Sequence, residues 1–137
     1  MSERIYLDAN VWLDYFEDRK DSIRPLGEFA FQVFKRALKC EFEIVASEWL
    51  LEELHKHANK ELLKNILQEL YQRHKLILEE ITDNDIKEVN ESDKQIHCED
   101  LRHYVFCKNH AIKFLVSRDR HLLEAGNGVV VVLPEEL

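Results

Sequence analysis

The stretch Ile5-Tyr6-Leu7-Asp8-Ala9-Asn10-Val11 decides the fold. It opens with a short apolar run, typical of a buried strand, and the run ends abruptly on Asp8. Burying an unpaired carboxylate is expensive, so Asp8 must face solvent, a partner or a metal ion. The pattern recurs near the other end of the chain, in Phe114-Leu115-Val116-Ser117-Arg118-Asp119. The two acids therefore become candidates for one shared site.

Apolar runs alternate with helical patterns along the chain. We expect strands at residues 4–7, 42–46, 76–81, 113–116 and 129–133, and helices at 10–16, 25–40, 47–57, 60–73, 83–91, 95–110 and 120–125. Asn10 and Ser47 are the expected helix caps. Continuous apolar strands fit a parallel sheet covered on both faces, which predicts an α/β fold. In open sheets of this kind, sites form at the carboxyl ends of strands where the strand order reverses.

Composition bounds the class of protein. A chain of 137 residues without a linker or repeat predicts one domain, residues 1–137. The net charge of −8 argues against broad nucleic-acid binding, although an enzyme can handle phosphates through bound cations. The longest apolar run, residues 129–133, is too short for a membrane span, and we see no secretory signal. Cys40, Cys98 and Cys107 indicate reduced thiols in the cytoplasm, with a Cys98–Cys107 staple as a less favoured alternative.

Helical spacing separates Glu53 from the acids around it. Its neighbours at positions −4, −3 and +1 are apolar: Trp49, Leu50 and Leu54. Glu53 is therefore expected on the buried side of its helix, near the carboxyl end of the second strand. Pairing with a lysine or histidine elsewhere is the structural alternative. The solvated, ion-paired face of the same helix is expected to carry Glu48, Glu52 and Lys56.

Asp100 shows the same contrast with its neighbour Glu99. It shares an apolar stripe with Ile96, Tyr104, Cys107 and Ala111. A helix cap is the alternative role for Asp100. Four carboxylates are thus expected to point inward, namely Asp8, Glu53, Asp100 and Asp119. Four like charges cannot share a small site unless they are protonated or neutralised, and all-oxygen ligation suits Mg²⁺ or Mn²⁺.

These segments together resemble the PIN-domain family, including the VapC toxins of toxin–antitoxin pairs. The resemblance covers residues 4–133 and rests on four segments in order: Tyr6-Leu7-Asp8-Ala9-Asn10-Val11, Val45-Ala46-Ser47-Glu48-Trp49-Leu50-Leu51-Glu52-Glu53-Leu54, Glu99-Asp100-Leu101 and Leu115-Val116-Ser117-Arg118-Asp119. The sequence departs from the family at His103-Tyr104-Val105, where many members have small residues. Bulkier side chains at these positions are expected to narrow the cleft.

The resemblance implies a three-layer α/β/α sandwich around a parallel five-stranded sheet. It implies a Mg²⁺- or Mn²⁺-dependent endoribonuclease, with Asp8, Glu53, Asp100 and Asp119 as catalytic and metal-binding residues. Asn10 and Ser117 would orient the acids and water through hydrogen bonds. RNA is then the substrate, an antitoxin protein a candidate partner, and a homodimer the expected assembly. Phe31, which falls off the apolar stripe of its helix, is either a second-layer contact or a dimer contact.

Other polar residues support weaker interpretations. Arg118 and Arg120 flank Asp119 and are candidates for phosphate contact, or else solvated arginines at a strand end. His55 and His57 point in different directions and make a poor metal pair. Surface or helix-end positions are expected for the other histidines considered, His97, His103, His110 and His121.

Two other classes of function compete with the nuclease. The first is a catalytically silent scaffold of the same fold, which the presence of all four acids argues against. The second is a receiver-type phosphotransfer domain, which needs a phosphorylatable Asp after the third strand and a Lys after the last. Glu79-Glu80-Ile81 and Leu133-Pro134 stand at those places, so the receiver hypothesis fails.

Overall fold

The computed structural model describes residues 3–17, 26–91, 98–119 and 129–137. Their elements, in chain order, are β1 (Glu3–Leu7), α1 (Ala9–Glu17), α2 (Leu26–Leu38), β2 (Phe42–Ala46), α3 (Glu48–His57), α4 (Lys60–Gln72), β3 (Leu76–Leu78), α5 (Asp83–Glu91), α6 (Cys98–Asn109), β4 (Phe114–Val116), β5 (Val130–Val132) and the short 3-10 helix η1 (Pro134–Glu136). None of the described helices has the length and apolar character that crossing a membrane requires.

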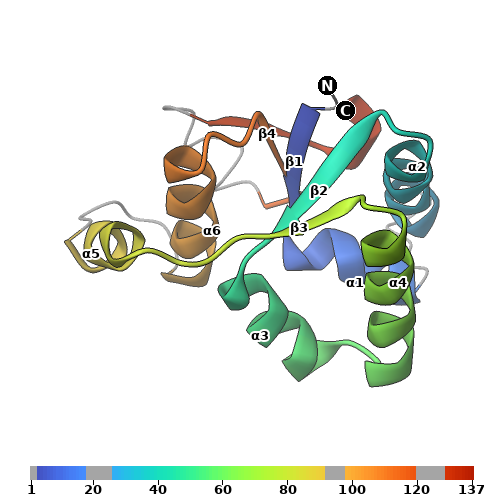
Figure 1. The fold of residues 1–137 in the computed structure, drawn as a ribbon, viewed down its shortest axis with the longest axis horizontal. Coiled ribbons are helices and arrows are strands. Elements are labelled where there is room, and N and C mark those ends of the chain that lie inside the picture. Colours follow the sequence, from blue (N-terminus) through green and yellow to red (C-terminus); the bar gives the residue numbers. More distant parts are fainter. Residues whose placement is uncertain (1–2, 18–25, 92–97, 120–128) are drawn as a thin grey trace.

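The strands form one parallel sheet in the order β3-β2-β1-β4-β5. The chain builds outward from β1 to β3 and then returns to β4, so the strand order reverses between β1 and β4. Figure 1 shows α5 and α6 on one side of the sheet, α1, α2 and α4 on the other, and α3 beyond the carboxyl ends of the strands. The expected α/β/α sandwich with a parallel five-stranded sheet is confirmed.

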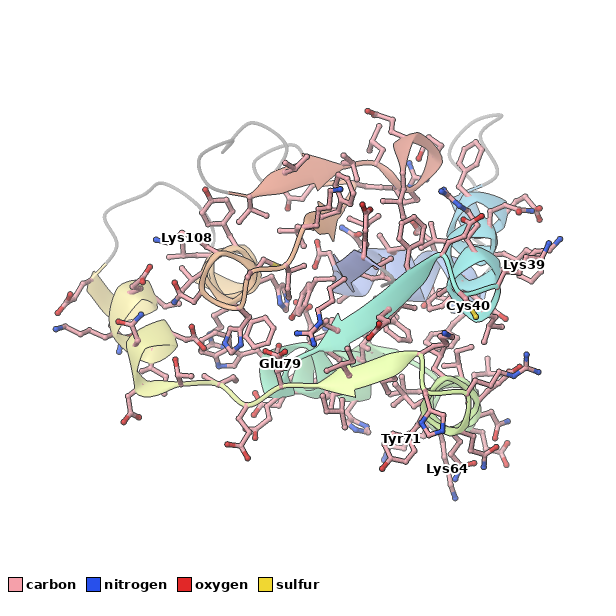
Figure 2. The ribbon with its side chains drawn as sticks, turned by 45° about the horizontal axis from the view of Figure 1, so that its top comes forward. Lys39, Cys40, Lys64, Tyr71, Glu79 and Lys108 are labelled. Atoms are coloured by element: carbon pink, nitrogen blue, oxygen red, sulfur yellow. The ribbon has the colours of Figure 1, made fainter. Side chains whose placement is uncertain are left out.

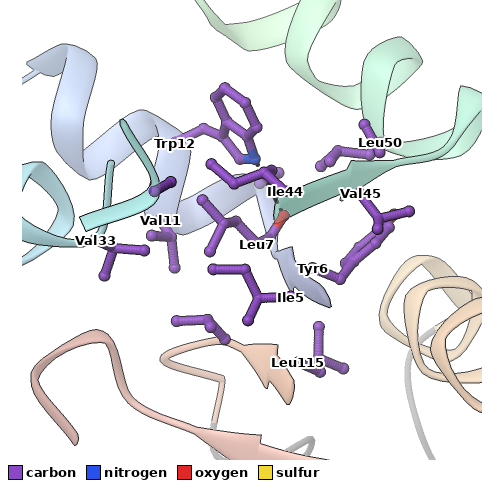
Figure 3. Packing of buried hydrophobic residues seen from close by; sticks show 14 of the residues in the cluster. Ile5, Tyr6, Leu7, Val11, Trp12, Val33, Ile44, Val45, Leu50 and Leu115 are labelled. Carbon is purple, nitrogen blue, oxygen red and sulfur yellow. Dashed lines mark hydrogen bonds between the residues drawn. The ribbon is translucent and has the colours of Figure 1, made fainter. Parts of the chain in front are cut away.

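β1 is the centre of the hydrophobic core because both of its faces are covered. Ile5, Tyr6 and Leu7 are fully buried, and Ile44 and Leu115 beside them are buried as well (Figure 3). A continuous apolar strand is what a doubly covered sheet requires. The indole N–H of Trp12 donates to the Leu7 carbonyl over 3.1 Å, so α1 is anchored to the carboxyl end of β1.

Several elements differ from their expected bounds, and in α1 and β3 the difference involves polar residues. α1 begins at Ala9, so Asn10 lies in its first turn instead of capping it. β3 ends at Leu78, earlier than predicted. Glu79 still donates a backbone hydrogen bond to Ala46 of β2, but Thr82 then caps the next helix, so the chain leaves the sheet before that residue. The cap predicted at Ser47 is confirmed, since its hydroxyl accepts the Leu50 amide over 3.2 Å. The helix predicted at 120–125 lies outside the described residues.

Three helices end on a left-handed residue that is not glycine. Cys40, His74 and Ala111 have φ values of 70°, 58° and 54° and follow α2, α4 and α6. Each is followed by an amide that bonds to the carbonyl five residues earlier, as in Lys75 to Leu70 at 2.8 Å. Glycine is the usual residue here, because a side chain at positive φ costs about 1 kcal/mol or more. These ends therefore lack their usual sequence signal.

α6 is buried around most of its circumference. It packs against α5, α3 and β4, and its middle residues Leu101, His103, Tyr104, Val105, Phe106 and Cys107 are all buried. Cys107 is a thiol and takes part in no disulfide. Burial, reinforced by the charge of Asp8, raises the pKa of the Cys107 thiol well above its ordinary value. Because α6 is covered on several sides, spacing alone misassigns its buried polar residue His103.

Candidate metal centre

Asp8 lies at the point where β1 ends and α1 begins, beside the strand-order reversal. Its backbone amide continues the ladder to Val116 of β4 at 2.9 Å. The carboxylate accepts hydrogen bonds from the Ala9 amide at 2.7 Å, the Ser117 hydroxyl at 2.8 Å and the Asn10 amide group at 3.3 Å. Asp8 is only 4% exposed, so these donors hold the carboxylate in one orientation inside the protein.

Electrostatics make a bare Asp8 carboxylate costly. Burial raises its pKa above the ordinary value, and the nearby charge of Glu53 adds to that rise. His103 and the hydrogen bond from Ser117 act in the opposite direction without cancelling it. A cation next to this carboxylate would therefore relieve a real penalty.

Glu53 reaches the same place from α3. The Ser47 cap begins this helix directly after β2, so the second turn projects Glu53 over the carboxyl ends of β1 and β2. Its Oε2 lies 3.2 Å from Nε2 of His103. Pairing with a histidine, the structural alternative from sequence, is therefore present. The pairing does not separate Glu53 from Asp8, because the same histidine lies between the two carboxylates.

His103 is the residue that sequence reasoning missed. The prediction of a surface or helix-end position is wrong, because its side chain is 2% exposed. Nε2 lies 3.2 Å from Glu53 and 3.8 Å from Asp8, while Nδ1 lies 2.7 Å from the Tyr6 hydroxyl. One ligand atom from each of Asp8, Glu53 and His103 falls within 4.8 Å of the other two. The available signal was its departure from the family pattern at this position.

The remaining predicted acids stand at the same edge of the sheet. Asp119 follows β4, is half-buried, and its amide donates to the Ser117 hydroxyl over 3.0 Å. Ser117 thus joins the two strand ends, since the same hydroxyl donates to Asp8. Asp100 lies in the first turn of α6, and its side chain falls outside the description. The structure brings Asp8 and Glu53 together, and the joint role of all four acids stays a prediction.

Arg118 has a structural role that the sequence left open. Its guanidinium donates to the buried Asp14 carboxylate at 3.2 Å and to Glu135 at 3.2 Å, and it lies over the Phe29 ring. These ion pairs join the end of β4 to α1 and to the C-terminal residues. A phosphate contact would require Arg118 to leave one of them. Arg120 lies outside the described residues.

A pocket beside the group carries both aromatic and charged side chains. It is lined by Trp49, Glu52, Glu53, Lys56, Arg102 and His103. The Arg102 guanidinium lies over the Trp49 ring at 5.6 Å. Within the described part of the chain, Lys56 and Arg102 form no ion pair. Glu48, Glu52 and Lys56 are exposed, so the face of α3 that was predicted to be solvated is solvated. The ion pairs predicted on this face are absent within the described part of the chain.

The donor set suits a divalent metal ion. Two carboxylates and an imidazole converge, and the carboxylates repel one another when no cation is present. The side-chain oxygen of Asn10, next to Asp8, is buried and accepts no hydrogen bond within the described structure. A metal-bound water is a donor that would satisfy it. The residues present therefore fit the ion that the resemblance implies.

Comparison with known proteins bears on the fold. No family model and no curated protein sequence matches this chain. Among solved structures, this chain aligns with a chain of the VapBC2 complex from Rickettsia felis, which is bound to a DNA fragment from its promoter. The TM-score is 0.65 and the sequence identity 13%, and the alignment covers 95% of this chain and 98% of that one. A chain of a toxin–antitoxin complex from Klebsiella pneumoniae aligns with a TM-score of 0.60 and 16% identity over 95% and 97%. Likeness at this identity establishes fold, and this chain has the PIN-like fold that its sequence predicts.

Proposed function

We propose that this chain is a divalent-metal-dependent endoribonuclease that hydrolyses RNA phosphodiester bonds. The convergence of Asp8 and Glu53 at the strand-order reversal carries the proposal, because it gathers negative charge in a place that has no packing use for it. Asp100 and Asp119, on the elements next to that reversal, complete the proposed metal-binding and catalytic set. The likeness to toxin–antitoxin complexes supports a toxin-type nuclease.

The chain's own groups would hold and orient the reacting parts. Ser117 and Asn10 donate to the same oxygen of the Asp8 carboxylate and so help to fix its orientation, and a ligand atom of Asp8 lies within 4.8 Å of one of Glu53. When bound, Mg²⁺ or Mn²⁺ would lower the pKa of coordinated water and stabilise charge on the phosphodiester. Hydrolysis then needs no catalytic histidine.

The pocket next to the metal group supports a nucleic-acid substrate. Among the described residues, Lys56 and Arg102 offer two positive charges that form no ion pair, and the Arg102 guanidinium lies over the aromatic ring of Trp49. Positive charges of this kind bind phosphates, and aromatic rings stack on bases. On a chain with net charge −8, such a local pair of cations favours a single strand entering at this place.

Partners and setting follow from the same proposal. An antitoxin protein is the proposed partner, because both similar structures are toxin–antitoxin complexes. A homodimer and a cytoplasmic setting complete the proposal. Phe31 is 42% exposed and touches Tyr15 edge-on, so either of its two expected roles is compatible with its position.

The deciding experiment is cleavage of a mixed set of structured and single-stranded RNAs with Mn²⁺, Mg²⁺ or EDTA. Wild type and Asp8→Asn/Asp100→Asn are purified side by side. We expect metal-dependent cutting that disappears in the double variant. Equal cutting by both would place the activity elsewhere or in a contaminant. Neither cutting nor metal binding by wild type would favour the catalytically silent scaffold.

A second experiment tests the substrate pocket. Lys56→Ala and Arg102→Ala should each raise KM several-fold and reduce the salt dependence of binding by about 0.7 in the log–log slope for a single strand. Lys64→Ala is the matched control, because Lys64 is exposed and points outward from α4 (Figure 2). Equal effects of all three substitutions would indicate general charge attraction and not a pocket.

A further inference from the structure

The polar contacts of His103 point to a role that the four carboxylates do not cover. Its ring is buried between Tyr6, on the core side, and the two carboxylates of Asp8 and Glu53. The Tyr6 and His103 rings pack with centroids 5.4 Å apart, and burial together with contacts at both ring nitrogens restrains the imidazole in this orientation. Whatever occupies the space beside Asp8 and Glu53 must therefore meet Nε2 of His103.

The other side of the ring is held by a chain of hydroxyl groups. The Tyr6 hydroxyl lies 2.7 Å from Nδ1 of His103 and 2.8 Å from the Ser47 hydroxyl, which also accepts the Leu50 amide. The chain has a consistent proton order in which Nδ1–H donates to Tyr6 and Tyr6 donates to Ser47. This order leaves the Nε2 lone pair directed at the two carboxylates. A lone pair facing carboxylate oxygens is repulsive unless a cation lies between them.

The opposite proton order is equally complete without a cation. Ser47 then donates to Tyr6, Tyr6 donates to Nδ1, and Nε2–H donates to Glu53. The same framework can thus hold the carboxylates through a hydrogen bond or present a nitrogen ligand to an ion. Metal-binding histidines almost always donate their second ring N–H to a protein acceptor, and Tyr6 is placed to accept it.

The spacing of the ligand atoms agrees with coordination. Neighbouring ligands of an octahedral ion at about 2.1 Å are about 3.0 Å apart, and opposite ligands about 4.2 Å. Nε2 of His103 lies 3.2 Å from Glu53 and 3.8 Å from Asp8, and the group as a whole lies within 4.8 Å. Small adjustments of side chains would place all three atoms around one ion.

We propose that Nε2 of His103 is a ligand of the metal ion, and that this nitrogen directs the site toward transition metals such as Mn²⁺ or Co²⁺ over Mg²⁺. Imidazole binds transition metals well, whereas Mg²⁺ selects oxygen ligands. Tyr6 is the positioning residue, because it fixes the tautomer and orientation of the ring. The inference rests on the metal site of the proposed function and adds a ligand that an all-carboxylate site lacks.

The test is pulsed EPR of the full-length protein loaded with Mn²⁺. Wild type should show the modulation of a directly coordinated imidazole ¹⁴N, and labelling histidine with ¹⁵N should replace it with the ¹⁵N pattern. The isotope comparison needs no substitution, so it stands even if a variant fails to fold. His103→Gln should bind Mn²⁺ without the nitrogen signal, whereas His55→Gln, on an exposed position of α3, should keep it.

Affinities measured by titration calorimetry supply the second readout. His103→Gln should weaken Co²⁺ and Mn²⁺ binding about tenfold or more and change Mg²⁺ binding far less. Tyr6→Phe should weaken Mn²⁺ binding about tenfold, the usual effect of removing a group that orients a ligand. Mn²⁺ bound to wild type without nitrogen coupling would overturn this inference and leave the nuclease proposal standing. If wild type bound no metal, or bound it no more tightly than Asp8→Asn does, both this inference and the nuclease proposal would be overturned.

Discussion

Asp8→Asn should stabilise the metal-free protein while abolishing its activity. The folded protein raises the pKa of Asp8 through burial, so the folded state holds the proton more tightly than the unfolded chain. Stability therefore falls as pH rises from the unfolded pKa through the folded one, and the penalty is complete only above the folded pKa. Asparagine carries no charge and still accepts the Ala9 amide, so it removes this penalty.

The magnitude follows from the size of the chain and the state of the site. Relieving a strained functional residue adds about 0.5–2 kcal/mol. For 137 residues, 1 kcal/mol corresponds to about 3–4 °C in Tm, so Asp8→Asn should melt about 2–7 °C above wild type in EDTA. Mn²⁺ at about 100 times its Kd should add about 2.7 kcal/mol, or about 9 °C, to wild type alone. The order of the two melting temperatures should therefore reverse when Mn²⁺ replaces EDTA.

Thermal melts followed by circular dichroism at neutral pH measure this reversal. Asp14→Asn is the matched control, because Asp14 is also buried but its charge is paired with Arg118. Asp14→Asn should lower Tm by a similar amount in EDTA and in Mn²⁺, since it removes the buried carboxylate of the Asp14–Arg118 pair and leaves Arg118, among the described carboxylates, only its contact with Glu135. A metal-free Asp8→Asn that melts below wild type would refute the reasoning, because the carboxylate would then be a net stabilising group.

Three further predictions concern contacts around the site. Burial tends to lower the pKa of His110, but hydrogen bonds to Asp85 and Glu79 (labelled in Figure 2) outweigh it, so this pKa is raised. Burial tends to raise the pKa of Asp85, but the hydrogen bonds that its carboxylate accepts lower it. The contribution of His110 to folding stability is present below about pH 6.5 and is lost at higher pH, whereas that of Asp85 is present above about pH 4. His110→Gln should therefore lower the free energy of unfolding in urea by about 1–2 kcal/mol at about pH 5.5 and by less at about pH 8.5. Equal losses at the two pH values would contradict the assignment. Ser117→Ala removes the hydroxyl that joins the two strand ends and should lower metal-dependent cleavage about 10- to 100-fold with the fold intact; a change of less than about twofold would count against a supporting role. His74→Gly should stabilise the protein by about 0.5–1 kcal/mol, because His74 is exposed at a φ of 58°, and a loss of stability in the same unfolding assay would show that its side chain has a hidden contact.

The local sequence pattern was sufficient to predict an element or a side-chain position wherever it depends only on the residues of that element. The apolar run before Asp8 predicted the central strand, because a strand buried on both faces must be apolar throughout. Ser47 predicted the start of α3 through a hydrogen bond that spans three residues. Glu53 could be separated from its exposed neighbours because α3 is covered on one side only, so its spacing distinguishes a buried stripe from a solvated one.

Pattern failed where several elements meet. His103 was expected at the surface, yet α6 packs against α3, α5 and β4, and spacing within one helix cannot show which of its polar residues these neighbours bury. Arg118 could not be separated from a phosphate ligand, because its partner Asp14 lies 104 residues earlier in the chain. The left-handed ends of three helices carry no glycine, so the usual sequence signal for the end of a helix is missing there.

The parallel α/β architecture, the strand end on which Asp8 stands and the choice of acids proposed to hold a metal can all be inferred from the residue pattern. These depend on periodicity and on the cost of burying charge, which act within one element at a time. The hydrogen-bonded chain of Tyr6, Ser47 and His103 behind the carboxylates becomes visible only in the folded protein. That chain joins residues from β1, the start of α3 and α6, and its existence depends on the distance between elements, which no local pattern encodes.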